Sequence, residues 1–91
     1  MARPRVKRCL RFKPGVKYFK PQGIPMRMLT EEILMHEEIE AIKLYEVDGL
    51  SQIEAAEKMG VSQPTFARIL DKAIKKVARA LVKGKALRIE I

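Results

Sequence analysis

The chain has few residues that could support covalent or metal chemistry. It contains no tryptophan, one cysteine and one histidine among 91 residues. A single cysteine cannot form an internal disulfide, which fits a reducing cytoplasm. His36 has no neighbouring cysteine or histidine, so it does not supply the ligand set of a metal site. The sequence also offers no nucleophile–base arrangement and no glycine-rich phosphate loop. We therefore expect no enzyme activity, no metal and no other cofactor.

Long hydrophobic runs are missing as well. No stretch approaches the roughly 18 apolar residues of a membrane span. The basic N-terminus lacks the apolar region of a secretory signal. Hydrophobic residues make up 47% of the chain, which is enough for one small domain with a modest core. We expect a cytoplasmic protein that does not contact membranes.

Charge is abundant and is divided into blocks. The formal net charge is +8. Residues 1–30 carry nine Lys or Arg and no acid, residues 31–57 carry nine acids and one Lys, and residues 58–91 carry nine Lys or Arg against two acids. A polyanion would therefore be attracted to part of the surface only, and a nucleic acid is the expected class of partner.

The stretch 49–83 has the local signals of a helix-turn-helix. Ser51 and Glu54 form the spacing of a capping box, which predicts a helix start. Gly60 can adopt the left-handed conformation of a tight turn, and Ser62 can cap the next helix. Pro64 fits the first turn of that helix. Ile53, Ala56 and Met59 share one face of the shorter helix.

The second helix of this pair has two distinct faces. At about 100° per residue, the apolar face holds Phe66, Ile69, Leu70, Ala73, Ile74, Val77 and Leu81. The opposite side holds Thr65, Arg68, Lys72, Lys75, Lys76, Arg79 and Lys83. A helix of about 20 residues spans about 30 Å, so we expect only its first turns to enter a DNA groove.

The remaining chain predicts one more helix and two strands. The helix is expected from about His36 to Asp48, with Ile39, Ile42, Leu44 and Tyr45 turned inward. Alternation predicts strands at 6–13 and 86–91, which we expect to pair with each other. The alternative is pairing with the same strand of a second subunit, which would give a homodimer. Residues 1–34 are expected to form a basic arm, a strand and a Pro/Gly-rich loop, packed on a domain comprising residues 35–91.

Three motifs together resemble a known family. They are GIP-x-R-x-L, the run EAIKLYEVDGLSQIEAAEKMGVSQPTFARIL, and a closing GKALRIE. They are similar to a family of small uncharacterised prokaryotic proteins predicted to bind DNA, whose helix-turn-helix resembles region 4 of sigma factors. The resemblance covers about residues 8–90. It implies a mainly α fold with a three-helix core, short N- and C-terminal strands, and DNA binding.

These observations predict sequence-specific binding of double-stranded DNA by a small transcriptional regulator. We expect the base contacts from Gln63, Thr65 and Arg68, because glutamine can pair with adenine and arginine with guanine. Phosphate contacts are expected from Ser51, Ser62, Lys72, Lys75, Lys76 and Arg79. Arg3 and Arg5 are expected to form an arm that contacts the DNA backbone or minor groove.

Two other functions fit the same sequence. Sigma-like helix-turn-helix domains also dock on proteins, and the acidic block 31–57 could face RNA polymerase or another basic partner. RNA binding is the second alternative, because Tyr18 and Phe19 lie among lysines and aromatic rings can stack on bases.

Overall fold

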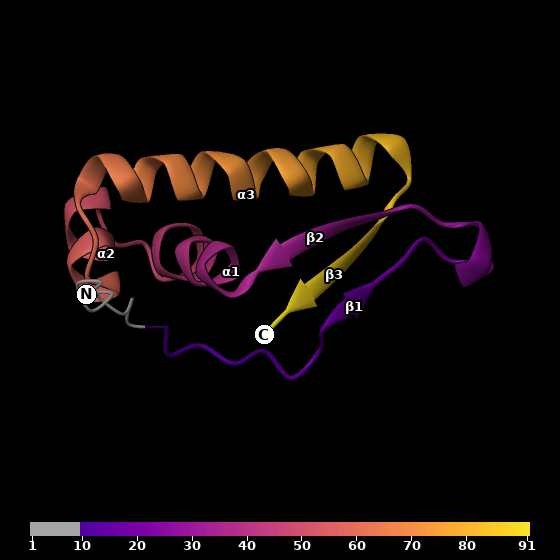
Figure 1. Cartoon of the computed structure of the whole chain (residues 1–91), viewed down its shortest axis with the longest axis horizontal. Helices are drawn as coiled ribbons and strands as arrows, with labels where there is room; N and C mark the ends of the chain where they lie inside the picture. The colour runs from indigo at the N-terminus through magenta and orange to yellow at the C-terminus, as the bar shows by residue number, and fades with distance from the viewer. Residues whose placement is uncertain (1–9) are drawn as a thin grey trace, which may run out of the picture.

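The protein, described here by a computed structural model for residues 10–91, has three α-helices and a small three-stranded sheet (Figure 1). The elements follow the order β1 (Tyr18–Phe19), β2 (Glu31–Met35), α1 (His36–Ile42), α2 (Gln52–Met59), α3 (Gln63–Lys83) and β3 (Ala86–Glu90). A 3₁₀ turn at Met26–Met28 precedes β2, and a π-helical turn at Lys43–Val47 continues α1. The fold is mainly helical, as the sequence predicts.

The ends of α2 agree with the predicted capping pattern. Ser51 Oγ accepts a hydrogen bond from the Glu54 backbone N–H at 3.1 Å, and Glu54 Oε1 accepts one from the Ser51 N–H at 3.0 Å. Gly60 ends the helix in the left-handed conformation, with φ of 71°. A side chain would be strained at this φ, so glycine allows the chain to turn within three residues.

The predicted boundaries of the other two helices are also confirmed. Ser62 caps α3, and Gly84 ends it with φ of 66°. The helix expected from His36 to Asp48 is present as α1 plus the π-helical turn, and Gly49 follows with φ of 77°. Local capping chemistry therefore determines where each helix starts and stops.

The predicted strand pairing is wrong. In the described part of the expected strand 6–13, residues 10–13 form no strand, and residues 6–9 lie outside the described residues. β3 is instead the central strand, antiparallel to β1 on one side and parallel to β2 on the other. β2 was not predicted as a strand, and it crosses the expected domain boundary at residue 34. Its sequence, EEILM, lacks the alternation that identifies a half-buried strand.

The core has two neighbouring clusters. The larger joins α1, α2 and the first half of α3, with Phe66 and Met59 fully buried at its centre. The smaller lies between the sheet and α3 and contains Leu34, Ala73 and Ile89. Figure 1 shows this arrangement, with α1 and α2 beneath one end of α3 and the sheet beneath the other.

Three apolar residues predicted to share the buried faces are exposed. Ile53 on α2 and Ile74 and Leu81 on α3 all face solvent. Beyond Leu70, α3 extends past α2 and rests on the sheet, so a narrower side of the helix is covered. Small residues, Ala73 and Ala80, make that contact, and the larger neighbours lie outside it.

Two carboxylates of α1 are buried. Glu38 is 2% exposed and Glu40 is 3% exposed. Glu40 Oε1 accepts a hydrogen bond from the Phe12 backbone N–H at 2.8 Å, and His36 Nε2 lies 2.7 Å from the Phe12 carbonyl oxygen. Glu40 and His36 therefore hold the chain at Phe12 against α1, while Glu37 and Glu38 place carboxylates near the positive end of the helix dipole.

Within residues 10–91, no helix is both long enough and apolar enough to cross a membrane. The same part of the chain holds no group of three or more metal-ligating side chains placed to bind a metal ion.

Candidate nucleic-acid interface

The first turns of α3 present a hydrogen-bonded row of polar side chains. The Ser62 hydroxyl accepts from the Thr65 backbone N–H at 3.3 Å and donates to Thr65 Oγ1 at 2.9 Å. Arg68 Nη2 in turn donates to Thr65 Oγ1 at 3.3 Å. Because these residues are three positions apart, they lie on one side of the helix. The row holds the Arg68 guanidinium beside the start of α3 and leaves its other donors available.

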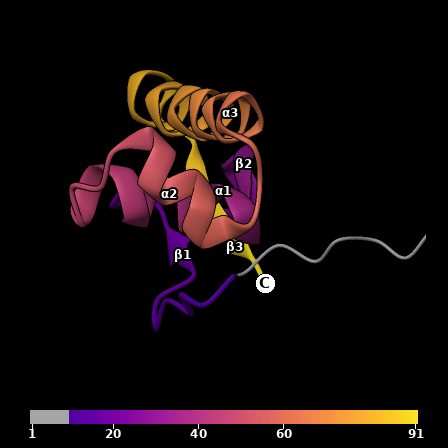
Figure 2. The same cartoon turned by 90° about the vertical axis from the view of Figure 1, so that its left-hand side faces the viewer.

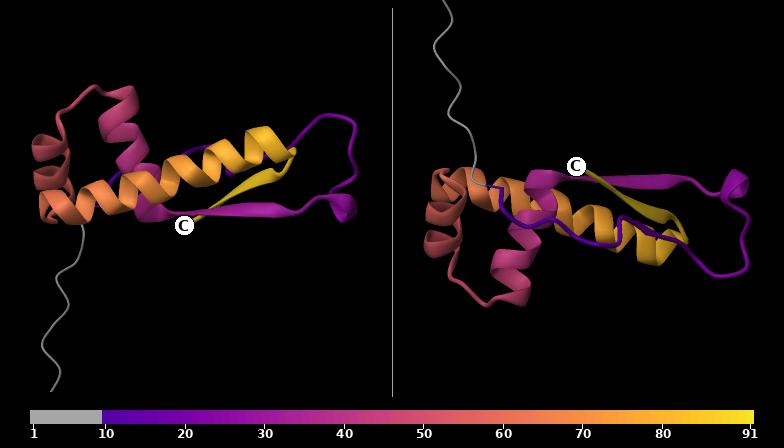
Figure 3. Two further views of the ribbon diagram at one scale, coloured as in Figure 1. Left: turned by 90° about the horizontal axis from the view of Figure 1, so that it is seen from above. Right: turned by 90° about the horizontal axis from the view of Figure 1, so that it is seen from below.

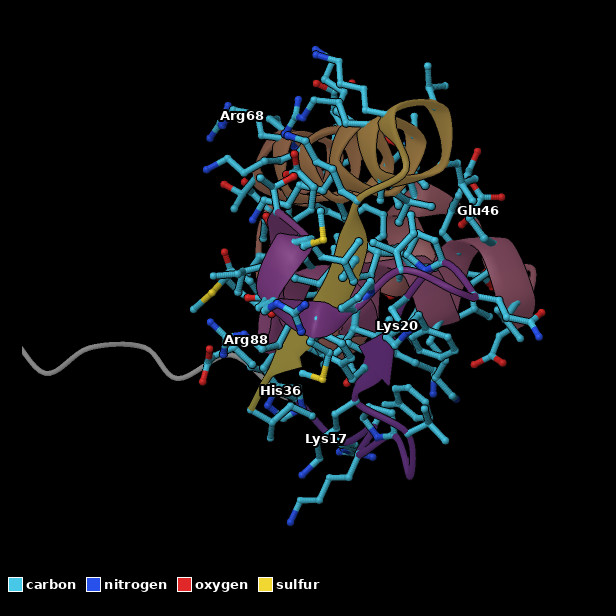
Figure 4. The ribbon with its side chains drawn as sticks, turned by 90° about the vertical axis from the view of Figure 1, so that its right-hand side faces the viewer. Lys17, Lys20, His36, Glu46, Arg68 and Arg88 are labelled. Atoms are coloured by element: carbon cyan, nitrogen blue, oxygen red, sulfur yellow. The ribbon has the colours of Figure 1, made fainter. Side chains whose placement is uncertain are left out.

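The side chains around this row are exposed. Gln63 and Lys72 face solvent at positions flanking Arg68. Neither Arg68 nor Lys72 makes an ion pair with an acid of residues 10–91. Figure 4 shows Arg68 extending away from the body of the molecule. The start of α3 is thus positively charged and combines an amide, a hydroxyl and a guanidinium on an accessible surface.

The basic residues further along α3 are placed differently. Lys75 pairs with Asp71 at 3.0 Å on the exposed surface. Lys76 is mostly buried and its Nζ lies 2.8 Å from Glu38 Oε1. Arg79 donates two hydrogen bonds to Glu32, at 3.1 and 3.2 Å. The four basic residues among the predicted phosphate contacts therefore divide into Lys72, which has no acidic partner within residues 10–91, and three residues that have one.

Glu32 neutralises two basic residues at once. Its carboxylate accepts hydrogen bonds from Arg79 and, at 2.9 Å, from Lys85 Nζ. Only 12% of the Glu32 side chain is exposed. The two hydrogen bonds from Arg79, followed by the one from Lys85, hold the pKa of Glu32 at about 2. Glu32 is therefore ionised throughout the physiological range, and the middle and end of α3 carry less net positive charge than the sequence indicates.

A shallow hollow of about 420 Å³ adjoins the polar row. It lies between the start of α1 and the start of α3, and its lining includes Glu37, Arg68 and Lys72. Acidic and basic groups therefore meet at the edge of the candidate interface. A carboxylate in this position can accept a hydrogen bond from the amino group of cytosine, although it repels phosphate.

The other predicted contacts lie at helix starts or outside the described residues. Ser51 caps α2, which lies beneath the first turns of α3 (Figure 2). Backbone N–H groups at the start of a helix can bind phosphate oxygens. Arg3 and Arg5, the predicted arm, lie outside residues 10–91.

The acids that pair with α3 were not identified from the sequence. Glu32 is 47 residues from Arg79, and Glu38 is 38 residues from Lys76. The only sequence signal is that an acidic block precedes a basic helix, which indicates attraction without specifying partners. The missing information is the position of β2 beneath α3.

Comparisons with known proteins identify relatives along nearly the whole chain. A family model described as "Protein of unknown function DUF134" matches residues 1–90. A UPF0251 protein of Moorella thermoacetica is 54% identical over 90 residues, and one of Thermoanaerobacter pseudethanolicus is 56% identical over 90 residues. Each alignment covers 99% of this chain, but 60% of the first relative and 76% of the second.

The chain therefore spans between about three fifths and three quarters of the length of these two relatives. No solved structure gives a significant match to it. The match of the family model to residues 1–90, together with identities above one half, shows that the chain belongs to the DUF134/UPF0251 family.

Proposed function

We propose that this protein binds double-stranded DNA, with α2, the turn at residues 60–62 and the first turns of α3 acting as a helix-turn-helix. In such motifs the second helix enters the major groove, and its N-terminal residues contact base edges. The three-residue turn supports this role, because Gly60 takes the left-handed conformation and Ser62 caps the following helix. The resemblance to region 4 of sigma factors belongs to the same proposal.

The observation that carries the proposal is the row Ser62–Thr65–Arg68 on an accessible, positively charged helix start. Arg68 has free donors for the O6 and N7 atoms of guanine, and Gln63 can pair with adenine. Thr65 orients Arg68 through its hydroxyl. A side chain held in place before binding loses less conformational entropy on contact.

Phosphate binding is assigned to fewer residues than the sequence predicts. Lys72 and the helix starts at Ser51 and Ser62 remain in this role. Lys76 and Arg79 are reassigned to stability, because using them for phosphate would leave Glu38 and Glu32 without their partners. Lys75 is partly available for phosphate binding, since its ion pair with Asp71 is exposed and weak.

Docking on RNA polymerase or another protein, and RNA binding, remain the alternative proposals. The described aromatic residues give RNA little support, because the Tyr18 hydroxyl donates to Glu31 at 2.8 Å and Tyr18 belongs to β1. The ring of Phe19 is about half exposed.

Binding to a random pool of DNA duplexes tests the proposal. We expect selection at about 50 mM salt to enrich a motif containing guanine, and affinity for it to fall linearly with salt on a log–log plot. Structured RNA at equal concentration should not displace the selected duplex. Failure to bind duplex DNA at that salt, together with capture by RNA polymerase, would favour protein docking. Displacement by RNA would favour RNA binding.

A further inference from the structure

One flank of α3 carries an apolar stripe that the rest of residues 10–91 leaves uncovered. Ile74 is 39% exposed and Leu81 is 77% exposed, and Ala78 between them is exposed as well. Their spacing of four and then three residues places them on one line along the helix. Figure 3, viewed from above, shows no other helix or strand of the described residues lying over α3. We call Ile74, Ala78 and Leu81 the apolar stripe.

The apolar stripe continues into a hollow beside the end of α3. The hollow has a volume of about 330 Å³, and its lining includes Leu81, Phe19, Pro21 and Leu87. Phe19 is 53% exposed. A stripe of apolar side chains next to an apolar hollow is the arrangement expected of a surface that packs against another helix.

The apolar stripe and the polar row lie on different sides of α3. At about 100° per residue, Ile74 is about 120° around the helix from Arg68, and Leu81 about 140°. Figure 4, viewed from the end of the molecule where α3 stops, shows Arg68 on one side of the helix and Glu46 of the π-helical turn on the other. A partner on the apolar stripe would therefore leave the polar row accessible.

We propose that a second copy of this chain covers the apolar stripe, with the two α3 helices antiparallel about a two-fold axis. An axis between Val77 and Ala78 places Ile74 of each copy opposite Leu81 of the other. Ala78 then lies next to the axis, where its small side chain allows the helices to approach closely. Two-fold pairing is self-complementary, so one stripe supplies both halves of the contact.

The positions of two charged side chains favour the antiparallel arrangement. Tyr45 packs against Phe66 with ring centroids 6.4 Å apart, so the neighbouring Glu46 lies beside the first half of α3. Lys20 lines the same hollow as Leu81, so it lies beside the end of α3. The antiparallel axis puts Glu46 of one copy and Lys20 of the other on the same side of the axis, whereas a parallel arrangement would bring like charges together.

Both of these charged groups are available. Glu46 is exposed and makes no ion pair with residues 10–91. Lys20 Nζ donates to the carbonyl oxygens of Pro21 and Ile24, and has no carboxylate partner in the same range. The antiparallel contact would place each of them at the same end of the interface as a group of opposite charge.

The fold does not favour a dimer through the terminal strands. Both edges of β3 are already occupied, by β1 and by β2. The outer edge of β2 is partly covered, because Lys76 Nζ donates to the Ile33 carbonyl oxygen at 2.6 Å. The apolar stripe is therefore the better place for the homodimer contact that the sequence left open.

The contact has a consequence that rests on the proposed function. At 1.5 Å per residue, Arg68 lies about 14 Å from the axis and Gln63 about 22 Å. The two polar rows would be separated by about 28 to 43 Å along the helices. This range includes the spacing of about 34 Å between half-sites one DNA turn apart. A dimer of this kind would read a two-fold symmetric site.

The oligomeric state of the full chain tests the proposal directly. In sedimentation equilibrium, the mass should rise with protein concentration and approach, at about 100 μM, twice the 10.4 kDa of one chain. Leu81→Glu should raise the dimer dissociation constant at least tenfold. The matched control is Met28→Glu, because Met28 is also an exposed apolar residue (69%) but belongs to the 3₁₀ turn before β2, outside the apolar stripe. A monomeric wild-type chain, or a Leu81→Glu chain that dimerises like wild type, would overturn the proposal.

Charge reversal tests the arrangement of the two copies. Glu46→Lys and Lys20→Glu should each weaken the dimer, and the double variant should recover most of the loss. If the two changes are independent, the double variant should raise the dimer dissociation constant by the product of the two single increases. An increase that large would overturn the antiparallel contact. Circular dichroism melts of each variant distinguish these effects from unfolding.

Different experimental results would contradict the dimer and the proposed function. A wild-type chain that binds duplex DNA as a monomer would overturn the dimer and leave DNA reading intact. A dimer that binds no duplex at low salt would support the apolar stripe as a contact and contradict the proposed function.

Discussion

At the scale of single residues, two carboxylates determine which basic groups of α3 are available for binding. Glu38 pairs with Lys76, and Glu32 pairs with both Arg79 and Lys85. Arg68 and Lys72, at the start of the helix, have no such partner within residues 10–91. The start of α3, where helix geometry also leaves backbone N–H groups without partners inside the helix, therefore carries available positive charge.

Glu32 should make stability depend on pH in acid. Its folded-state pKa is about 2, below the ordinary value of 4.5. A lowered pKa means that the ionised carboxylate stabilises the fold fully above about pH 4.5, and that this stabilisation is lost as pH falls toward 2. Thermal melts should therefore show Glu32→Gln well below wild type at pH 7, with the difference shrinking between pH 4.5 and 2.

Glu57→Gln is the matched control for that experiment. Glu57 is exposed on α2 and has no ion-pair partner within residues 10–91. Its melting temperature should follow wild type at every pH. A Glu32→Gln difference that stays constant from pH 7 to pH 2.5 would refute the assigned role of Glu32.

At the scale of elements, Lys76 links α3 to the open edge of the sheet. Its ammonium group donates to the Ile33 carbonyl oxygen of β2 and to Glu38 at the start of α1. Glu38 also accepts from the Met35 backbone N–H at 2.8 Å, at the junction of β2 and α1. One lysine thus holds three elements together and covers part of an edge that could otherwise pair with another chain.

Replacement of Lys76 should therefore reduce stability. Lys76→Met leaves Glu38 as a buried charge without its partner, and we expect a loss of about 3 kcal/mol in the free energy of unfolding. Lys75→Met removes an exposed pair one turn apart, and should cost less than about 0.5 kcal/mol. Urea unfolding of the two variants measures the contrast. Equal midpoints would show that the Lys76 contacts contribute nothing.

The elements differ in how far the sequence predicts them. The three helices could be located because their signals are local: Ser51 with Glu54, Gly60 with Ser62, and Gly84 each act within one turn. The sheet could not be located from the sequence, because β2 and β3 pair across 55 positions, as in Glu31 with Ala86. β1 has two residues, too few for any alternation, and hydrogen bonds with a distant strand define it.

In the candidate site, too, the sequence predicts what depends on local spacing and misses what depends on distant contacts. Gln63, Thr65 and Arg68 could be chosen because helical spacing alone puts polar residues beside the helix start. The positions of Lys76 and Arg79 could not, because helical spacing says which side of α3 they occupy and nothing about the acids of β2 and α1 beneath it. The exposure of Leu81 was missed for a related reason, since the sheet covers a narrower side of α3 than the apolar face suggests.

At the scale of the whole molecule, folding redistributes the three charge blocks. Glu31, Glu32 and Glu38, from the acidic block, pair with basic residues of α3, β3 and the loop between them. Among residues 10–91, the positive charge without an acidic partner includes Arg68 and Lys72 at the start of α3, and also Lys83 and Lys20 near its end. Under the proposed function, DNA would approach the end of the molecule where α2 meets α3 (Figure 1).

The central claim is that the start of α3 reads DNA, and one comparison tests it most directly. Wild type, Arg68→Ala and the control Lys83→Ala are titrated with a selected duplex and with an unrelated duplex. Arg68→Ala should lose about 1–3 kcal/mol of binding free energy on the selected duplex, and much less on the unrelated one. Lys83→Ala, at the far end of α3, should change both alike and slightly. Arg68→Ala titrations that match wild type on both duplexes would contradict the account.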